Sequence, residues 1–335
     1  MKKIEEIKNI SVEEFHHEIV PAGKPIVIRD LVKDWPIVTE GKKGNYAFCE
    51  YIKKFDIGLN VNTIYGDPSI NGRVFYNHDL TGLNCSLGQH NVLDSLNYLQ
   101  EHANDNQAPT IALQSVAIDR HFPGMQNENP LFLLDKNINP RIWIGSKVIV
   151  AAHYDPSENI ACCVTGRRRF TLLPPEEVGN LYVGPLEYTP AGSPISMVDF
   201  EKPDFEQYPK FKQALSAALQ TELNPGDAIF IPYLWWHHVQ SLEGINALVN
   251  YWWNHADSKR DEPRNALFHS MLSIRDLPPH QRQAWHALFE HYVFEKNGSA
   301  AAHLPLNRQG ILGEISDDYI KTIRLALSKS LNHLP

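Results

Sequence analysis

A His-X-Asp tripeptide and a later histidine pair are the residues of this sequence best suited to hold a metal ion. His153 and Asp155 flank Tyr154, and residues i and i+2 of a β-strand project from the same face. An imidazole and a carboxylate could therefore converge on one cation. A third ligand could come from His237 or His238, and only one of these neighbours can face the same side of a strand.

The sequence contains two His-X-Asp tripeptides, and the residues around each one indicate which is the metal-binding candidate. A chain with 16 histidines is expected to contain about one such tripeptide by chance. The copy His255-Ala256-Asp257 precedes a charged run at 258–262, and no further strands follow it, so we interpret it as a surface turn. His153 instead precedes an apolar run at 160–164. Two histidines and a carboxylate on one face are the ligand set of non-haem Fe(II) oxygenases.

Short β-branched and aromatic runs dominate the middle of the chain. From about residue 110 they alternate with proline, glycine and asparagine, and they lie at 142–144, 148–150, 169–173, 228–231 and 247–252. The turn sequence Pro225-Gly226-Asp227 introduces the run that ends at the histidine pair. Many short strands separated by turn residues are typical of a β-barrel or sandwich.

Helical patterns lie on both sides of this β-rich region. Ser11 and Glu14 form a capping box, and further helical patterns cover 46–55 and 92–102. After about residue 261, apolar stripes recur at helical spacing, in Trp285, Leu288, Phe289 and Tyr292 and in Tyr319, Ile320, Ile323 and Leu327. We therefore predict a domain at 1–260 and a helical extension at 261–335, which either packs on the barrel or forms a homodimer.

Composition narrows the classes of partner and compartment. The 335 residues carry a net charge of -8, from 31 basic and 39 acidic side chains, which does not favour nucleic acid as a partner. No run approaches the length of a membrane span, and the charged N-terminus lacks the apolar segment of a signal peptide. The four cysteines form no Cys-X-X-Cys pair, so we expect a reducing, cytoplasmic location.

Together, these residues resemble the cupin-like Jumonji-C-type hydroxylases, which include the asparaginyl hydroxylase of hypoxia-inducible factor and bacterial cupin-like proteins. The resemblance covers about two thirds of the chain, from residue 24 to 252. It is strongest at His153-Tyr154-Asp155 and Gly166-Arg167-Arg168, and at Trp235-Trp236-His237-His238. It implies a mainly β fold, with a double-stranded β-helix (cupin or jelly-roll) core and helical segments at both ends.

The resemblance also implies cofactors and site residues. Fe(II) would be held by His153, Asp155 and His237, with 2-oxoglutarate as the co-substrate. The distal carboxylate of 2-oxoglutarate would bind a buried cation, usually lysine in the family and here Arg168. The residues implied to line the co-substrate pocket are Asn159, Asn250 and Gln114, and those expected near the substrate are Tyr76, Asn77, Trp235 and Trp252.

Three positions depart from the family pattern. Arg168 replaces lysine, Ala112 stands where a tyrosine often contacts the co-substrate, and Val150 stands where a threonine often does. Strand alternation predicts that Arg168 faces inward while Arg167 and Arg169 face outward. We therefore expect an Fe(II)- and 2-oxoglutarate-dependent oxygenase that hydroxylates a protein side chain or a small molecule. The alternatives are a metal-dependent cupin enzyme that does not use 2-oxoglutarate, a non-catalytic binding module, and a scaffold based on the C-terminal helices.

Overall fold

The computed structural model describes residues 1–105, 107–187, 189–190, 192–254 and 261–332. The chain divides into two compact units, Met1–Asn254 and His255–Pro335, which are described separately below. The predicted surface turn at His255-Ala256-Asp257 lies outside the described residues, and the predicted domain boundary after residue 260 lies at their edge.

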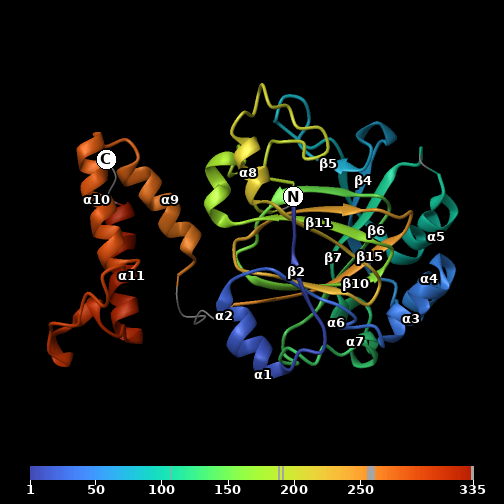
Figure 1. Ribbon diagram of the computed structural model, residues 1–335, viewed down its shortest axis with the longest axis horizontal. Coiled ribbons are helices and arrows are strands. Elements are labelled where there is room, and N and C mark those ends of the chain that lie inside the picture. The colour runs from blue at the N-terminus through green and yellow to red at the C-terminus, as the bar shows by residue number, and fades with distance from the viewer. Residues whose placement is uncertain (106, 188, 191, 255–260, 333–335) are drawn as a thin grey trace. The chain divides into compact units, whose positions relative to one another are not determined.

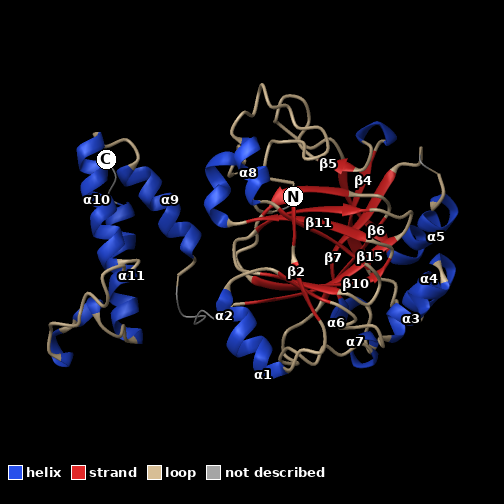
Figure 2. Ribbon diagram, viewed as in Figure 1, coloured by secondary structure: helices blue, strands red, loops and turns tan. Residues whose placement is uncertain are grey.

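Two β-sheets form the centre of the first unit (Figures 1 and 2). The six-stranded sheet has the order β1 (Lys2–Lys3), β12 (Leu219–Leu223), β11 (Arg168–Leu173), β14 (Trp236–Ser241), β9 (Ile149–His153) and β5 (Arg73–Val74). The nine-stranded sheet has the order β2 (Glu5–Ile7), β3 (Ile26–Ile28), β13 (Ala228–Ile231), β10 (Glu158–Thr165), β15 (Asn246–Trp253), β8 (Arg141–Gly145), β7 (Thr110–Ala117), β4 (Asn60–Gly66) and β6 (Ser86–Asn91).

Successive strands cross between the two sheets, as a double-stranded β-helix requires. The series β8 to β11 alternates between the sheets, and so does the series β12 to β15. Side chains of both sheets meet in one buried cluster that includes Phe170, Ile229 and Val239. The predicted fold class, mainly β with flanking helices, is therefore confirmed.

Glycine makes the tight turn between β10 and β11 possible. Gly166 adopts φ +70°, and a Cβ atom there would lie 2.4 Å from Oδ1 of Asn246. A larger residue would meet both backbone strain and a steric clash. The turn fixes the start of β11, and so the position of Arg168.

Helices cover the outer face of the larger sheet. They are α1 (Val12–Glu14), α2 (Val20–Ala22), α3 (Pro36–Lys43), α4 (Asn45–Lys53), α5 (Val92–His102), α6 (Ile118–His121) and α7 (Met125–Glu128), and α8 (Phe211–Ala217) lies beside the smaller sheet (Figure 1). One hydrogen bond of the predicted capping box is present, because the Glu14 N–H donates to the Ser11 hydroxyl at 3.1 Å. Ile37, Phe48 and Leu96 are fully buried in the core cluster on that face.

The second unit is helical throughout its regular elements. It contains α9 (Pro263–Ile274), α10 (Pro279–Tyr292) and α11 (Asp317–Asn332). The predicted apolar stripes correspond to α10 and α11. Among its described residues only Ala300 and Ala301 are buried. In the described part of the chain, no helix combines the length and the apolar character needed to cross a membrane.

Candidate metal centre

The two sheet strands β9 and β14 bring three potential ligands together. His153 ends β9 and pairs directly with His237 near the start of β14, so the two imidazole rings lie 4.1 Å apart between centroids. Asp155 follows two residues after His153, and its Oδ2 lies 3.6 Å from Nε2 of His237. One potential ligand atom from each residue lies within 4.8 Å of the others. The group can therefore hold one metal ion.

Backbone carbonyls orient both imidazole rings. Nδ1 of His153 lies 2.9 Å from the carbonyl oxygen of Ala151, and Nδ1 of His237 lies 3.0 Å from that of Trp235. The carbonyl acceptors favour the tautomer that carries its proton on Nδ1. Each Nε2 then keeps a free lone pair, as a metal ligand requires.

Burial keeps His237 in the neutral form. Desolvation, helped by the neighbouring His153, lowers the pKa of His237 to about 4, although Asp155 acts in the opposite direction. A neutral imidazole is the form that binds metal, so protons compete weakly for this ligand.

The adjacent His238 points away from the metal centre. It is buried and its ring stacks on Phe200, with centroids 4.8 Å apart and the planes 17° from parallel. Desolvation lowers the pKa of His238 to about 3. His237 is therefore the histidine of the pair that joins His153 and Asp155.

A cavity of about 720 Å³ lies over the metal ligands and extends to the side chain of Arg168. This guanidinium is buried, and its burial lowers the pKa of Arg168 to about 10, so it stays charged at neutral pH. Its Nε has no hydrogen-bond partner among the described residues. Arg167 and Arg169 instead form ion pairs with Glu243 and Glu222. Arg168 thus faces inward and its two neighbours face outward, as strand alternation predicted.

Amide and indole groups line the cavity near the metal ligands. Asn250 donates from Nδ2 to Oδ1 of Asn159 at 2.8 Å, while its own Oδ1 has no partner in the described part of the chain. Trp252 also lines the cavity, and its buried Nε1 has no described acceptor. Gln114 lines the wall and donates to the carbonyl of Ala112 at 3.3 Å. The cavity therefore presents unused donors and acceptors.

Three of the residues expected near the substrate do not line this cavity. Tyr76 is buried against Ala151 and Ile195. Asn77 holds a turn, because its side chain accepts from the Gly82 N–H at 3.0 Å. Trp235 donates from Nε1 to the carbonyl of Gly23 at 3.1 Å and packs against a buried cluster that includes Val27. Of the four predicted positions, only Trp252 reaches the cavity.

Several lining residues were not predicted from the sequence. Ser241 pairs with Arg168 across β14 and β11. Its position four residues after His237, on the same face of the strand, was the available signal. Trp143, Asn62 and Gln89 also line the cavity, but no motif marks them.

Two of the three departures from the family pattern, Ala112 and Val150, lie on one apolar wall. Ala112 belongs to a buried cluster with Ile64, Val74 and Val148, and Val150 packs against it. This wall faces the same cavity as Arg168. It offers no side-chain hydroxyl at these two positions, and Arg168 and Ser241 are polar groups that line the same cavity.

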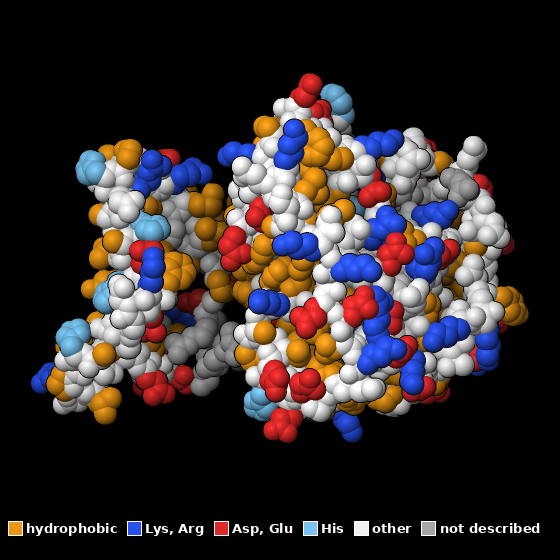
Figure 3. All heavy atoms as spheres, in the orientation of Figure 1, with side chains coloured by type: hydrophobic (Ala, Val, Ile, Leu, Met, Phe, Trp, Pro, Cys, Tyr) orange, Lys and Arg blue, Asp and Glu red, His pale blue; other side chains and the backbone are white. Residues whose placement is uncertain are grey.

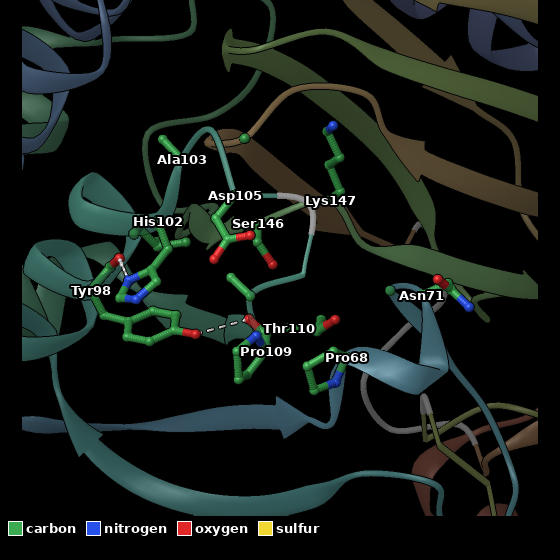
Figure 4. Close-up of a pocket in the computed structure, with 14 residues that line it drawn as sticks. Pro68, Asn71, Tyr98, His102, Ala103, Asp105, Pro109, Thr110, Ser146 and Lys147 are labelled. Atoms are coloured by element: carbon green, nitrogen blue, oxygen red, sulfur yellow. Dashed lines mark hydrogen bonds between the residues drawn. The ribbon is translucent and has the colours of Figure 1, made fainter.

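A second cavity, of about 200 Å³, lies away from the metal ligands (Figure 4). The rings of Tyr98 and His102 stack there with centroids 4.2 Å apart. The Tyr98 hydroxyl donates to the carbonyl of Pro109 at 3.2 Å, and Nδ1 of His102 lies 2.9 Å from the carbonyl oxygen of Tyr98. Both side chains are engaged within the fold, and we assign this cavity no chemistry.

Comparison with protein families gives one match that spans most of the chain. The family model described as "Cupin-like domain" matches residues 12–259, which include both metal-binding strands and the cavity walls.

Several named proteins are similar over the same region. JmjC domain-containing protein D of Dictyostelium discoideum is 27% identical, over 69% of this chain and 52% of its own length. Lysine-specific demethylase 8 of Xenopus tropicalis is 27% identical, over 73% of this chain and 51% of its own. The tRNA wybutosine-synthesizing protein 5 of Gallus gallus is 32% identical, over 44% of this chain and 41% of its own. The chain thus spans about half the length of these relatives.

Proposed function

The chain belongs to the family of cupin-like domains, and from that premise we propose that it is an Fe(II)- and 2-oxoglutarate-dependent oxygenase that hydroxylates its substrate. Its relatives carry Jumonji-C names, and Fe(II) with 2-oxoglutarate is the cofactor pair of that family. The observation that carries the proposal is one cavity that contains both the His-Asp-His group and a buried arginine without a described counter-charge.

The donor set fits Fe(II). Two imidazole nitrogens and one carboxylate occupy one side of the ion and leave other positions open for small molecules. When bound, the metal and 2-oxoglutarate supply oxidative decarboxylation to succinate and CO2, with one oxygen atom of O2 transferred to the substrate. The backbone acceptors of His153 and His237 hold both rings in the orientation that this binding needs.

Arg168 is suited to bind the distal carboxylate of the co-substrate. A guanidinium can hold a carboxylate with two parallel hydrogen bonds, and burial strengthens such a pair. The hydroxyl of Ser241, paired opposite Arg168, offers a further donor. The apolar wall around Ala112 and Val150 would exclude water from this end of the co-substrate.

The Asn159–Asn250 pair lies on neighbouring strands of the nine-stranded sheet and lines the cavity that contains the metal ligands. Asn250 donates to Asn159, and its free Oδ1 can accept a hydrogen bond from a bound molecule. We propose that this pair fixes the orientation of the co-substrate and its neighbour in the cavity. Gln114 would contribute from β7 of the same sheet.

Succinate production tests the proposal. The full chain, supplied with Fe(II), 2-oxoglutarate, ascorbate and air, should release succinate, and Asp155→Ala should abolish that release. Asp119→Ala, an exposed carboxylate outside the cavity, is the matched control and should behave as the parent. Iron binding without succinate would favour a metal-dependent cupin that does not use 2-oxoglutarate. Failure to bind iron at all would favour a non-catalytic binding module.

We also propose that the protein forms homodimers through its C-terminal helices and does not bind nucleic acid. The helical unit exposes large apolar side chains, including Trp285, Leu288 and Tyr292. On the face of the first unit seen in Figure 3, basic and acidic side chains are interspersed, which suits no polyanion. All four cysteines are free, so we propose a reducing compartment, the cytoplasm.

A further inference from the structure

Strand β6 has a free edge at the end of the nine-stranded sheet. It pairs with β4 on one side, and no described strand pairs with its other side (Figure 1). Its sequence Ser-Leu-Gly-Gln-His-Asn contains no proline and no Lys, Arg, Asp or Glu, the residues that usually protect exposed edges. The backbone groups of such an edge can pair with an added strand.

The same strand forms part of the cavity wall. Leu87, Gly88 and Gln89 line the cavity that contains the metal ligands. Leu87 is 66% exposed, which leaves a large apolar side chain at the rim. A chain that paired with this edge would therefore pass directly over the opening.

Two rows of side chains cross the strands β6, β4 and β7 on the cavity side. Leu87 lies opposite Ile64, which lies opposite Ala112, and these form an apolar row. Gln89 lies opposite Asn62, and its Nε2 donates to Oδ1 of Asn62.

Gln114 extends the second row on β7. It follows two residues after Ala112 on the same face, and it lines the cavity with Gln89 and Asn62. The three carboxamides form an amide row, beside the apolar row. A carboxamide offers one carbonyl acceptor and an N–H donor, so it matches the peptide groups of another chain.

The rest of the wall is neutral. Among the described residues that line the cavity, Asp155 and Arg168 are the only Asp, Glu, Lys or Arg side chains, and the proposed function engages both. Trp143 and Trp252 meet edge to face at 6.1 Å on the same wall. A cationic substrate side chain would be desolvated there without a carboxylate partner, which is unfavourable.

We propose that the substrate is a peptide segment in extended conformation, which pairs with the free edge of β6 and directs a neutral side chain to the metal centre. This inference rests on the proposed oxygenase function and specifies its substrate class. The apolar row and the amide row contact the peptide beside the reacting residue. Nucleic acid is disfavoured, because the net charge is -8 and the cavity offers a single arginine.

Peptide pools with chemically altered backbones test this inference. The full chain, with Fe(II), 2-oxoglutarate and air, is offered degenerate short peptides, each pool with one fixed central residue, and mass spectrometry detects the gain of one oxygen atom. Pools with a neutral central residue should react. The best peptide is then remade with N-methyl groups at alternate residues, which removes hydrogen-bond donors that strand pairing uses. Its KM should rise about tenfold or more, since each lost hydrogen bond costs about 1 kcal/mol.

Three results of that experiment would overturn the inference. N-methylated peptides that react as well as the parent would exclude strand pairing. An N-acetyl amino-acid amide that reacts as well as the peptide would indicate a small-molecule site. Reaction restricted to pools fixed as lysine or arginine would contradict the neutral side chain.

Protein variants and hydrogen exchange separate this inference from the oxygenase proposal. Leu87→Arg should raise the peptide KM, while Leu93→Arg, at an exposed position on α5 outside the cavity, should not. Saturating peptide should slow amide exchange within 86–91 even in the metal-free protein. Succinate release without oxygen gain in any pool, or unchanged exchange in β6, would refute the docking mode and leave the oxygenase proposal intact. Slowed exchange without any succinate release would support the docking mode and refute the oxygenase proposal.

Discussion

Arg168 carries a buried charge that we propose binds the distal carboxylate of 2-oxoglutarate. Its pKa of about 10 leaves it protonated at neutral pH, and it takes part in none of the ion pairs described for the chain. We expect Arg168→Met to raise the free energy of unfolding of the metal-free protein by about 1–3 kcal/mol, because an isolated buried charge is replaced by a side chain of similar length. Urea denaturation without 2-oxoglutarate measures the change.

Arg167→Met is the matched control for this substitution. Arg167 is half exposed and pairs with Glu243 at 2.7 Å, so its loss should change stability by less than about 1 kcal/mol. A destabilised Arg168→Met protein would contradict the account, since it would mean that the guanidinium is compensated within the empty fold.

His238 should make stability depend on pH. Burial lowers its pKa from 6.5 to about 3, so between these values the unfolded chain binds a proton that the folded chain does not. The free energy of unfolding should therefore fall on acidification below about pH 6.5, by at most about 1.4 kcal/mol per pH unit from this residue. His238→Phe should flatten that slope in urea titrations between pH 6.5 and 4.5.

The comparison for His238→Phe is a substitution at an exposed side chain that does not titrate. Leu93→Phe should leave the slope of stability against pH as it is in the parent. A His238→Phe protein with the slope of the parent would show that other groups carry the acid sensitivity.

At the scale of elements, helix α10 presents an apolar stripe with little to cover it. Trp285, Leu288 and Tyr292 are 45%, 44% and 51% exposed and share one side of the helix. Patches of this kind mark interaction surfaces. We expect Leu288→Asp to convert a dimer of the 38.1 kDa chain to a monomer in light scattering, while Gln283→Asp on the same helix leaves the dimer intact. A monomeric parent protein would refute the dimer proposal.

Elements with a regular apolar stripe could be predicted from the sequence, and elements without one could not. Helix α5 (Val92–His102) was expected over the same residues, because its buried side chains recur at helical spacing. Strand β6 was not predicted, since four of its six residues are exposed and leave no alternation of polar and apolar residues. Helix α3 (Pro36–Lys43) was not predicted either, and Pro36 occupies its first turn, where a proline is tolerated.

The metal site was more predictable than the cavity around it. His153 and Asp155 are close in sequence, so strand geometry alone places them together. Ser241 and Trp143 acquire a role only when strand pairing brings them to the wall, Ser241 through its register with Arg168. The family resemblance placed Tyr76 near the substrate, but in the structure its side chain packs into a buried cluster with Ala151.

At the scale of the whole molecule, ligand binding should stabilise the folded chain. His153 and His237 lie on neighbouring strands of one sheet but 84 positions apart in the sequence, so unfolding must disperse the metal ligands. Fe(II) at about a hundred times its dissociation constant should add about 2.7 kcal/mol to the free energy of unfolding. Anaerobic scanning calorimetry should show a higher midpoint in the parent and none of this shift in His153→Ala.

The exposed His78 provides the control for the stabilisation of the fold by Fe(II). His78→Ala should keep the shift, because it lies outside the cavity. An equal rise of the midpoint in His153→Ala would show that the metal binds elsewhere on the chain.

The most direct test of the account is an anaerobic titration of the full chain with Fe(II) and then 2-oxoglutarate, followed by visible absorption. The account predicts a weak charge-transfer band from the chelate, formed at a much higher 2-oxoglutarate concentration in Arg168→Ala, because the buried pair with the distal carboxylate is lost. Arg167→Ala should titrate as the parent. Iron that binds without producing the band would contradict the assignment of 2-oxoglutarate as co-substrate.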